Sequence, residues 1–210
     1  MHLEAINLGR RETIRLGART LDTGIDKQPV KHAYVGTLGL QGDVVADEEN
    51  HGGADQAVYL YSRADYDWWE RELGRPVDSG AFGENLTVSN FGQRELQPGD
   101  RLRIGPALLE LTSARIPCSV FANHMREEQW VKRFRSAERP GPYARVLEPG
   151  EVEAGMTIEL LAAPDGPTIL DSYRVYYDKG ASADAIRRLL AAPIASRERA
   201  ELEKRLAKRR

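Results

Sequence analysis

The chain has 210 residues, with 30 Lys or Arg and 32 Asp or Glu, and its net charge is -2 at neutral pH. This near balance gives no general attraction to nucleic acid or to an anionic membrane, so neither partner is expected. One cysteine excludes an internal disulfide, and the charged N-terminal region has no apolar run typical of a signal peptide or spanning helix. We therefore expect a cytoplasmic protein.

The first 42 residues predict strands and tight turns. Short apolar and β-branched runs, such as residues 12–16 and 33–36, alternate with glycines. Glycine permits the kinks and close backbone approaches that a curled sheet needs. A further strand is predicted over residues 57–61, directly after a loop that contains His51 and a glycine pair. His51 has two readings here, as a group that binds an anion or orients water and as a turn cap.

A helix is predicted over residues 62–74. Ser62 can cap it, Asp65 can close a capping pair, and Gly74 can end it. Tyr66 and Trp69 recur at helical spacing. This spacing is more typical of a helix face that packs on the sheet than of an aromatic platform for base stacking.

Residues 80–88 place an acid and an amide immediately before an apolar strand. Glu84 and Asn85 point in opposite directions along a strand, so at most one of them should face a given pocket. Asn85 has both donors and an acceptor, which suit either the edge of a heterocycle or a local turn bond.

Cys118 is predicted to lie in a turn between a strand and a helix. Strands over residues 101–104 and 107–112 form a hairpin that leads to this turn, and Pro117 suits the entrance of a helix. A thiol at a helix N-terminus, with Arg115 nearby, is biased toward the thiolate that ligates metals. The alternative is a small, inert, buried residue. Beyond the turn we expect a helix over residues 127–135, strands over 141–147 and 156–161, and turns at 148–151 and 154–155.

Residues 162–167 are the predicted boundary between a mainly β unit, residues 1–162, and a small helical segment, residues 167–210. Helices are expected over residues 168–177, 182–190 and 196–209, with Ser182 and Ser196 as N-caps. The last helix is rich in basic residues, which would also suit a nucleic-acid arm. Its interspersed glutamates favour an ordinary solvated helix.

Several enzyme classes lack their motifs in this sequence. We find no phosphate loop, dinucleotide fingerprint, paired-cysteine zinc site or His-Glu-x-x-His. No flavin, haem or iron–sulfur motif is visible either. No lysine has a recognisable Schiff-base context, which disfavours a pyridoxal-phosphate enzyme.

Five segments together resemble the MOSC family, named for the C-terminal domain of molybdenum cofactor sulfurase, and in particular its YiiM-like branch. They are GLQGD at 39–43, HGGADQAV at 51–58, FGENL at 82–86, PGDRLRIG at 98–105 and RIPC at 115–118. The resemblance implies a closed β-barrel with a few peripheral helices over residues 1–162. It also implies a three-helix segment over residues 167–210. The sequence leaves open whether these helices cover the site or form a homodimer contact.

The same resemblance implies a site for the molybdenum pyranopterin cofactor. Cys118 would be the molybdenum ligand or sulfur-binding residue, which agrees with the preference of soft thiolates for thiophilic metals. Arg115 would hold the anionic pterin or its phosphate. The remaining cofactor-binding residues would be His51, Asp55, Glu84 and Asn85.

The implied activity is the reduction of N-hydroxylated small molecules, including hydroxylamino base analogues, with electrons from a separate reductase. Two alternatives are a non-catalytic carrier of cofactor or of sulfur, with a persulfide on Cys118, and a cofactor-free scaffold. Three positions depart from the family pattern: Ala114 replaces a common proline, and Gln56 and Val120 replace common lysines. The two lost cations would weaken the binding of a phosphate-bearing cofactor.

Overall fold

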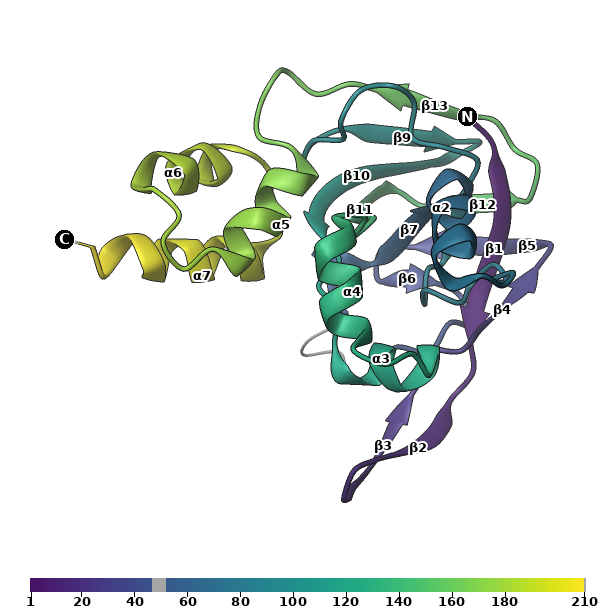
Figure 1. The fold of residues 1–210 in the computed structure, drawn as a ribbon. Coiled ribbons are helices and arrows are strands. Elements are labelled where there is room, and N and C mark those ends of the chain that lie inside the picture. Colours follow the sequence, from purple (N-terminus) through teal and green to yellow (C-terminus); the bar gives the residue numbers. More distant parts are fainter. Residues whose placement is uncertain (47–51, 210) are drawn as a thin grey trace.

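The computed structural model describes residues 1–46 and 52–209, and within them the largest sheet has eight strands (Figure 1). Only its β7–β8 pair is parallel. The strands, in their order across the sheet, are β13 (Ile158–Leu161), β9 (Arg101–Ile104), β10 (Ala107–Ala114), β11 (Pro142–Glu148), β7 (Val58–Ser62), β8 (Leu86–Val88), β1 (Leu3–Gly9) and β4 (Lys27–Val30).

Two smaller sheets complete the β structure that the model describes. One contains β12 (Gly150–Glu153), β5 (His32–Gly36) and β6 (Gly39–Leu40). The other is a hairpin of β2 (Glu12–Leu16) and β3 (Arg19–Thr23), which projects from the body of the molecule (Figure 1). The turn predicted at residues 148–151 was wrong in part, because Gly150 and Glu151 begin β12, which pairs with β5.

The expected closed barrel is not found among the described residues. One edge of β1 pairs with β8 and the other with β4, through Ile6 to Gly9. Only the first residues of the chain contact the far end of the sheet, next to β13. They form an isolated bridge between His2 and Thr157, with the Leu3 N–H donating to the Met156 carbonyl at 2.9 Å. The sheet is therefore mainly antiparallel and curled, without a continuous closing ladder.

Three helices cover one face of the sheet: α2 (Arg63–Leu73), α3 (Ser119–Met125) and α4 (Trp130–Ala137). The predicted caps of α2 are confirmed, since Ser62 Oγ accepts from the Asp65 N–H at 3.1 Å and Gly74 ends the helix at φ 66°. Aromatic side chains fill the space between these helices and the sheet, as predicted for Tyr66 and Trp69. This aromatic core contains Tyr59, Tyr61, Tyr66, Trp69, Phe82, Phe121, Trp130, Phe134 and Tyr143.

The C-terminal helices form a separate lobe beside the sheet (Figure 1). They are α5 (Ile169–Tyr177), α6 (Ala183–Ala191) and α7 (Ser196–Ala207), and a short 3₁₀ helix, η1 (Ala54–Gln56), lies in the sheet unit. Ser182 caps α6 as predicted. The expected Ser196 cap was wrong, because α7 begins after Ala195 and the Ser196 hydroxyl donates to Asp55 at 2.6 Å.

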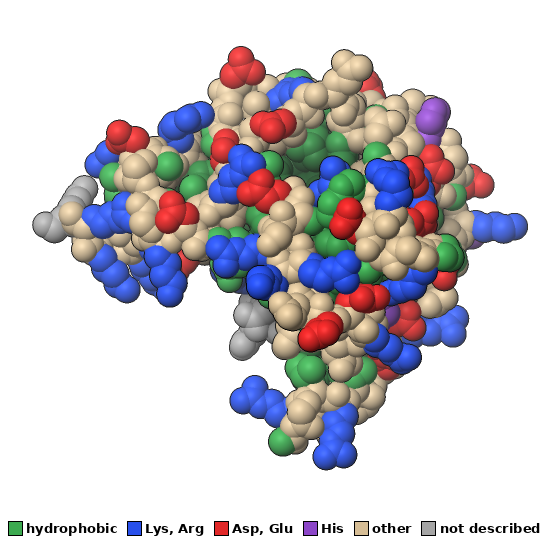
Figure 2. All heavy atoms as spheres, viewed as in Figure 1, with side chains coloured by type: hydrophobic (Ala, Val, Ile, Leu, Met, Phe, Trp, Pro, Cys, Tyr) green, Lys and Arg blue, Asp and Glu red, His purple; other side chains and the backbone are tan. Residues whose placement is uncertain are grey.

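Charged side chains of both signs cover this lobe, with Lys and Arg frequent along its lower edge in Figure 2. This mixed surface agrees with the solvated helix expected from the sequence. No helix in the described part of the chain is long and apolar enough to cross a membrane.

Candidate functional site

Cys118 lies where the sequence predicted it, in the turn between β10 and α3. It is the N-cap residue of α3, with an extended backbone, and its side chain is half-buried. Pro117 precedes it and is buried. The buried strand β10 and the aromatic core under α3 therefore hold the turn from both ends.

Arg115 is the most enclosed cation near Cys118, with 5% of its surface exposed. Its Nη1 donates to the Tyr143 hydroxyl at 3.0 Å, and its guanidinium lies 4.9 Å from the ring centroids of both Tyr59 and Phe121. Burial lowers the pKa of Arg115, but the phenols of Tyr143 and Tyr59 and the thiol of Cys118 raise it, and the pKa is above its usual value. Arg115 therefore stays charged beside the thiol.

A cavity of about 760 Å³ brings Cys118, Arg115 and Asn85 together; we call it the first cavity. Asn85 is held rigidly there, because its Oδ1 accepts from the Tyr59 N–H at 3.1 Å and its Nδ2 donates to Asp43 at 2.8 Å. Its amide is thus used in internal bonds, but these join distant parts of the chain and are not the local turn bond that the sequence suggested.

Lys27 and Asp43 also line the first cavity and form a buried ion pair, with Lys27 Nζ 2.6 Å from Asp43 Oδ1. The same carboxylate oxygen accepts from the Gly9 N–H at 2.6 Å. Burial lowers the pKa of Lys27, and Asp43 offsets part of that effect. The cavity therefore contains two buried cations, Lys27 and Arg115, and one buried carboxylate.

Glu84 lies outside the lining of the first cavity. Its Oε1 accepts from the hydroxyls of Tyr66 and Thr87, both at 2.6 Å, and from the Gly80 N–H at 2.8 Å. Burial raises the pKa of Glu84, although these bonds lower it in part. As expected, only one residue of the Glu84–Asn85 pair lines the cavity, but both residues precede β8, so strand alternation is not the reason. Glu84 instead fixes the loop that presents Asn85.

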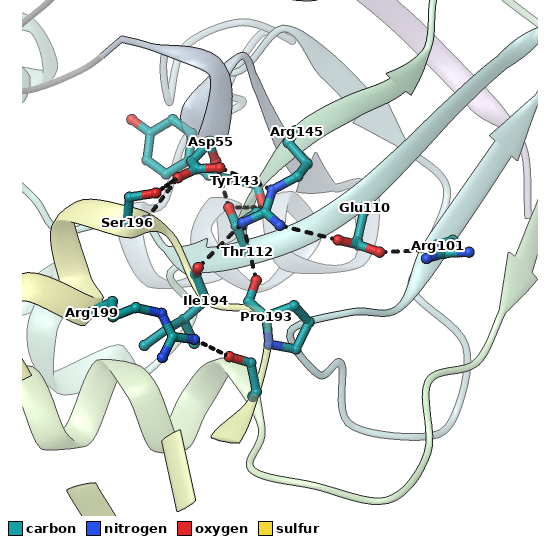
Figure 3. A network of polar contacts seen from close by, with 11 residues as sticks. Asp55, Arg101, Glu110, Thr112, Tyr143, Arg145, Pro193, Ile194, Ser196 and Arg199 are labelled. Atoms are coloured by element: carbon teal, nitrogen blue, oxygen red, sulfur yellow. Dashed lines mark hydrogen bonds and ion pairs between the residues drawn. The ribbon is translucent and has the colours of Figure 1, made fainter. Parts of the chain in front are cut away.

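Asp55 connects the sheet to the C-terminal lobe and does not line the first cavity (Figure 3). Its Oδ2 accepts from the Ser196 N–H at 2.7 Å, while its Oδ1 lies 3.0 Å from Arg145 Nε. Burial raises the pKa of Asp55, but the bonds from Ser196 and the Arg145 charge outweigh it, and the pKa is lowered. Arg145 in turn donates to the Pro193 and Ile194 carbonyls at 3.2 Å. His51 lies outside the described residues.

Two positions were singled out in the sequence because they lack the lysine of the family pattern. Both lie where the first cavity meets a second cavity. Gln56 and Val120 line both, together with Cys118, Ser119 and Tyr143. The second cavity, of about 860 Å³, lies between the Cys118 turn and helices α5 and α7. Arg197 Nη1 donates to Gln56 Oε1 at 2.9 Å, so that α7 supplies a cation beside position 56.

Sequence reasoning missed Lys27 and Asp43 as site residues. Asp43 ends the GLQGD segment, which was a usable signal, but Lys27 has none in its local sequence. Only the tertiary fold brings the two side chains together.

Comparisons with known proteins agree with this fold. A family model described as MOSC domain matches residues 47–159, and one described as YiiM-like, 3-alpha helix domain matches residues 167–209. The uncharacterized protein YflK of Bacillus subtilis (strain 168) is 34% identical over 189 residues, which cover 89% of this chain and 86% of YflK. A reductase of Gibberella moniliformis (strain M3125 / FGSC 7600) is 31% identical over 163 residues, which cover 76% of this chain and 29% of the reductase.

Among solved structures, the crystal structure of YiiM from Geobacillus stearothermophilus has a TM-score of 0.80 and 28% identity, and the match covers 98% of each chain. Both the sheet and the C-terminal helices are thus included in the similarity. The chain belongs to the MOSC-domain family, in its YiiM-like branch.

Proposed function

We propose that this protein binds the molybdenum pyranopterin cofactor in the first cavity and reduces N-hydroxylated small molecules. The observation that carries the proposal is the common location of the Cys118 thiol, the Arg115 guanidinium and the Lys27 ammonium in one cavity. Family membership and the likeness to part of a fungal reductase support the same assignment.

The cavity has the chemistry that this cofactor requires. A thiol is a soft donor for a thiophilic metal, and a phosphate or pterin oxygen needs buried cations and N–H donors. Arg115 Nε is buried and has no hydrogen-bond partner among the described residues. A buried donor without a partner costs about 1–3 kcal/mol, so a bound anion that accepts from it would stabilise the site. The cavity volume lies within the range of typical cofactor pockets.

The proposed roles follow from these positions. Cys118 would ligate the metal, and Arg115 and Lys27 would hold the anionic groups of the cofactor. Tyr59 and Phe121 keep the Arg115 guanidinium in place from both sides. Asn85 holds Asp43, which keeps Lys27 oriented. When bound, the cofactor supplies the two-electron redox chemistry.

The proposed reaction converts R–NHOH to R–NH₂ and water by cleavage of the N–O bond. It consumes two electrons and two protons. A separate reductase would provide the electrons, since no flavin, haem or iron–sulfur motif is visible in the sequence.

A sulfur carrier is the second candidate, favoured by the position of Cys118 on the walls of both cavities. A carrier must accept sulfur from one compound and pass it to another. Cys118 would take sulfane sulfur from a persulfide donor, which leaves as a thiol. Mass spectrometry of the chain after donor treatment would detect the persulfide, and lack of reductase activity in metal-loaded protein would favour this candidate.

The first test is the molybdenum content per chain of the wild type and of Cys118→Ser, both expressed in a host that makes the cofactor. We expect near-stoichiometric metal in the wild type and a marked loss in the variant, because a hydroxyl is a poor ligand for a soft metal. Equal melting temperatures would show that the loss is not caused by unfolding. Equal, negligible metal in both proteins would contradict the proposal.

A further inference from the structure

The buried part of the first cavity has less positive charge than a phosphate group needs. A phosphate monoester carries a charge of about -1.5 to -2 at neutral pH. Lys27 shares its charge with Asp43, because the two form a buried ion pair. The hydrogen bond of the Arg115 guanidinium is to a phenol, at 3.0 Å, and not to a carboxylate. A bound phosphate would therefore meet one full buried charge, and a second cation nearby would improve the balance.

Neighbouring residues fasten the first turn of α7 to η1 (Figure 3). Ser196 donates twice to Asp55, from its N–H at 2.7 Å and from its hydroxyl at 2.6 Å. The next residue, Arg197, donates from Nη1 to Gln56 Oε1 at 2.9 Å. Two consecutive residues of α7 thus bind two consecutive residues of η1. These bonds fix both the start of the helix and the place of the Arg197 guanidinium.

A third contact holds the same turn to α5. Glu198 Oε1 accepts from the Ser172 hydroxyl at 2.6 Å. Burial raises the pKa of Glu198 to about 7, while Ser172 and Arg199 act in the opposite direction. Glu198 is therefore only partly ionised at neutral pH, and it offsets less of the charge of its neighbour Arg197 than an exposed glutamate would.

Arg197 lies on the wall of the second cavity, beside a residue that lines both cavities, Gln56. The other charged residues of the second lining are Lys179, Glu198, Glu201, Lys204 and Arg205. With Arg197, this lining has four basic side chains and two carboxyl groups. Its charge is therefore positive next to position 56, where the lysine of the family pattern is missing.

We propose that Arg197 binds the phosphate group of the cofactor where the two cavities meet, and so supplies from α7 the cation that position 56 lacks. This inference rests on the proposed function and adds a residue of the C-terminal helices to the cofactor site. A guanidinium has several N–H donors in a planar fork, so one bond to Gln56 is compatible with bonds to phosphate oxygens. The attachment to η1 places Arg197 before binding, which reduces the entropy lost on binding.

The test is the rate at which the full chain loses cofactor after dilution. Elemental analysis measures the molybdenum that stays with the chain, and the fluorescence of the oxidised pterin measures the organic part. We expect Arg197→Gln to lose both about tenfold faster than the wild type, because charge-assisted hydrogen bonds are lost. The matched control is Arg188→Gln, since Arg188 is exposed on α6 and lies outside both linings. It should lose cofactor at the wild-type rate.

A second substitution separates the charge of Arg197 from a structural role. Adding Gln56→Lys to Arg197→Gln restores a cation at the same place but not the bond between α7 and η1. We expect this double variant to return to within about threefold of the wild-type rate. Melting temperatures of all variants check that the fold is retained.

Two results would overturn this inference alone: equal rates for Arg197→Gln and Arg188→Gln, and no recovery in the double variant. Failure of the cofactor proposal looks different, because the wild type itself would then contain neither molybdenum nor pterin. That result would overturn both proposals together.

Discussion

Glu198 makes the stability of the folded protein depend on pH. Its pKa is about 7 in the folded protein, against about 4.3 for an exposed glutamate in an unfolded chain. The folded state therefore binds more protons between these values, and the free energy of unfolding falls as the pH rises from about 4 to about 7. Above pH 7 both states are ionised and this contribution no longer changes.

We expect Glu198→Gln to flatten this dependence. Urea unfolding of the wild type and the variant, at steps of half a pH unit between pH 4 and 8, gives the free energy of unfolding of each protein against pH. The difference between these two curves measures the contribution of Glu198. Glu201→Gln is the control, because Glu201 is an exposed carboxylate on the same helix, and it should retain the wild-type slope. A parallel pair of curves for the wild type and Glu198→Gln would contradict the assignment.

At the same scale, the site was predictable where its residues are close in sequence. Arg115 and Cys118 are three residues apart in one turn, so local reasoning brought them together. Lys27 and Asp43 were missed because their pairing depends on how β4 and the loop after β6 meet. The family resemblance implied that Asp55 binds the cofactor, whereas Asp55 bonds to Ser196, 141 residues away, and no local pattern indicates such a contact.

At the scale of elements, the Asp55 network joins η1 to the start of α7 (Figure 3). Asp55 accepts two hydrogen bonds from Ser196 and pairs with Arg145 on β11. It thus acts as an N-cap supplied from another part of the chain, which satisfies a backbone donor in the first turn of α7.

Asp55→Ala is expected to lower the free energy of unfolding by about 1–3 kcal/mol, because it leaves the Ser196 and Arg145 donors without this acceptor. Hydrogen exchange should also show faster opening of the first turn of α7 than of β10. The matched control is Asp184→Ala, which removes an exposed ion pair with Arg187 in the first turn of α6. We expect Asp184→Ala to lower the free energy of unfolding by less than about 1 kcal/mol. An equal loss of stability in both variants would contradict a stabilising role of the Asp55 network.

Elements with local signals were predicted well. The caps of α2 and α6 are encoded by residues within one turn of the helix ends. The first two residues of β12 were predicted as part of a turn because Pro149 and Gly150 are turn formers, whereas their strand conformation depends on pairing with β5. Tertiary hydrogen bonds outweighed local preference at that point.

At the scale of the molecule, α5 belongs to two cores. Ile169 and Tyr173 pack in the core of the sheet, whereas Val175 packs with α6 and α7. The boundary predicted at residues 162–167 follows the change from strands to helices. The apolar contacts of α5 cross that boundary, so the sheet shares part of its core with the helical segment.

Two truncated chains test this sharing. A chain of residues 1–180 keeps α5 on the sheet, whereas a chain of residues 1–166 loses the buried side chains of Ile169 and Tyr173. We expect the shorter chain to be less stable than the longer one by about 3–6 kcal/mol, from the apolar surface that it exposes. Urea unfolding of both chains measures the difference. Equal stabilities would show that the sheet unit is independent of α5.

The closed barrel was the main error at this scale. Sequence patterns indicate strands and turns, but closure depends on whether the first and last strands align over several residues, and here they meet at one bridge. The family resemblance predicted the correct architecture, but it also implied a continuous pairing of the first and last strands, which is not found among the described residues.

The Cys118 turn borders both cavities, and five residues belong to both linings. Helices α5 and α7 line only the second cavity. Sequence changes on these two helices can therefore reshape the second cavity and leave the lining of the first unchanged.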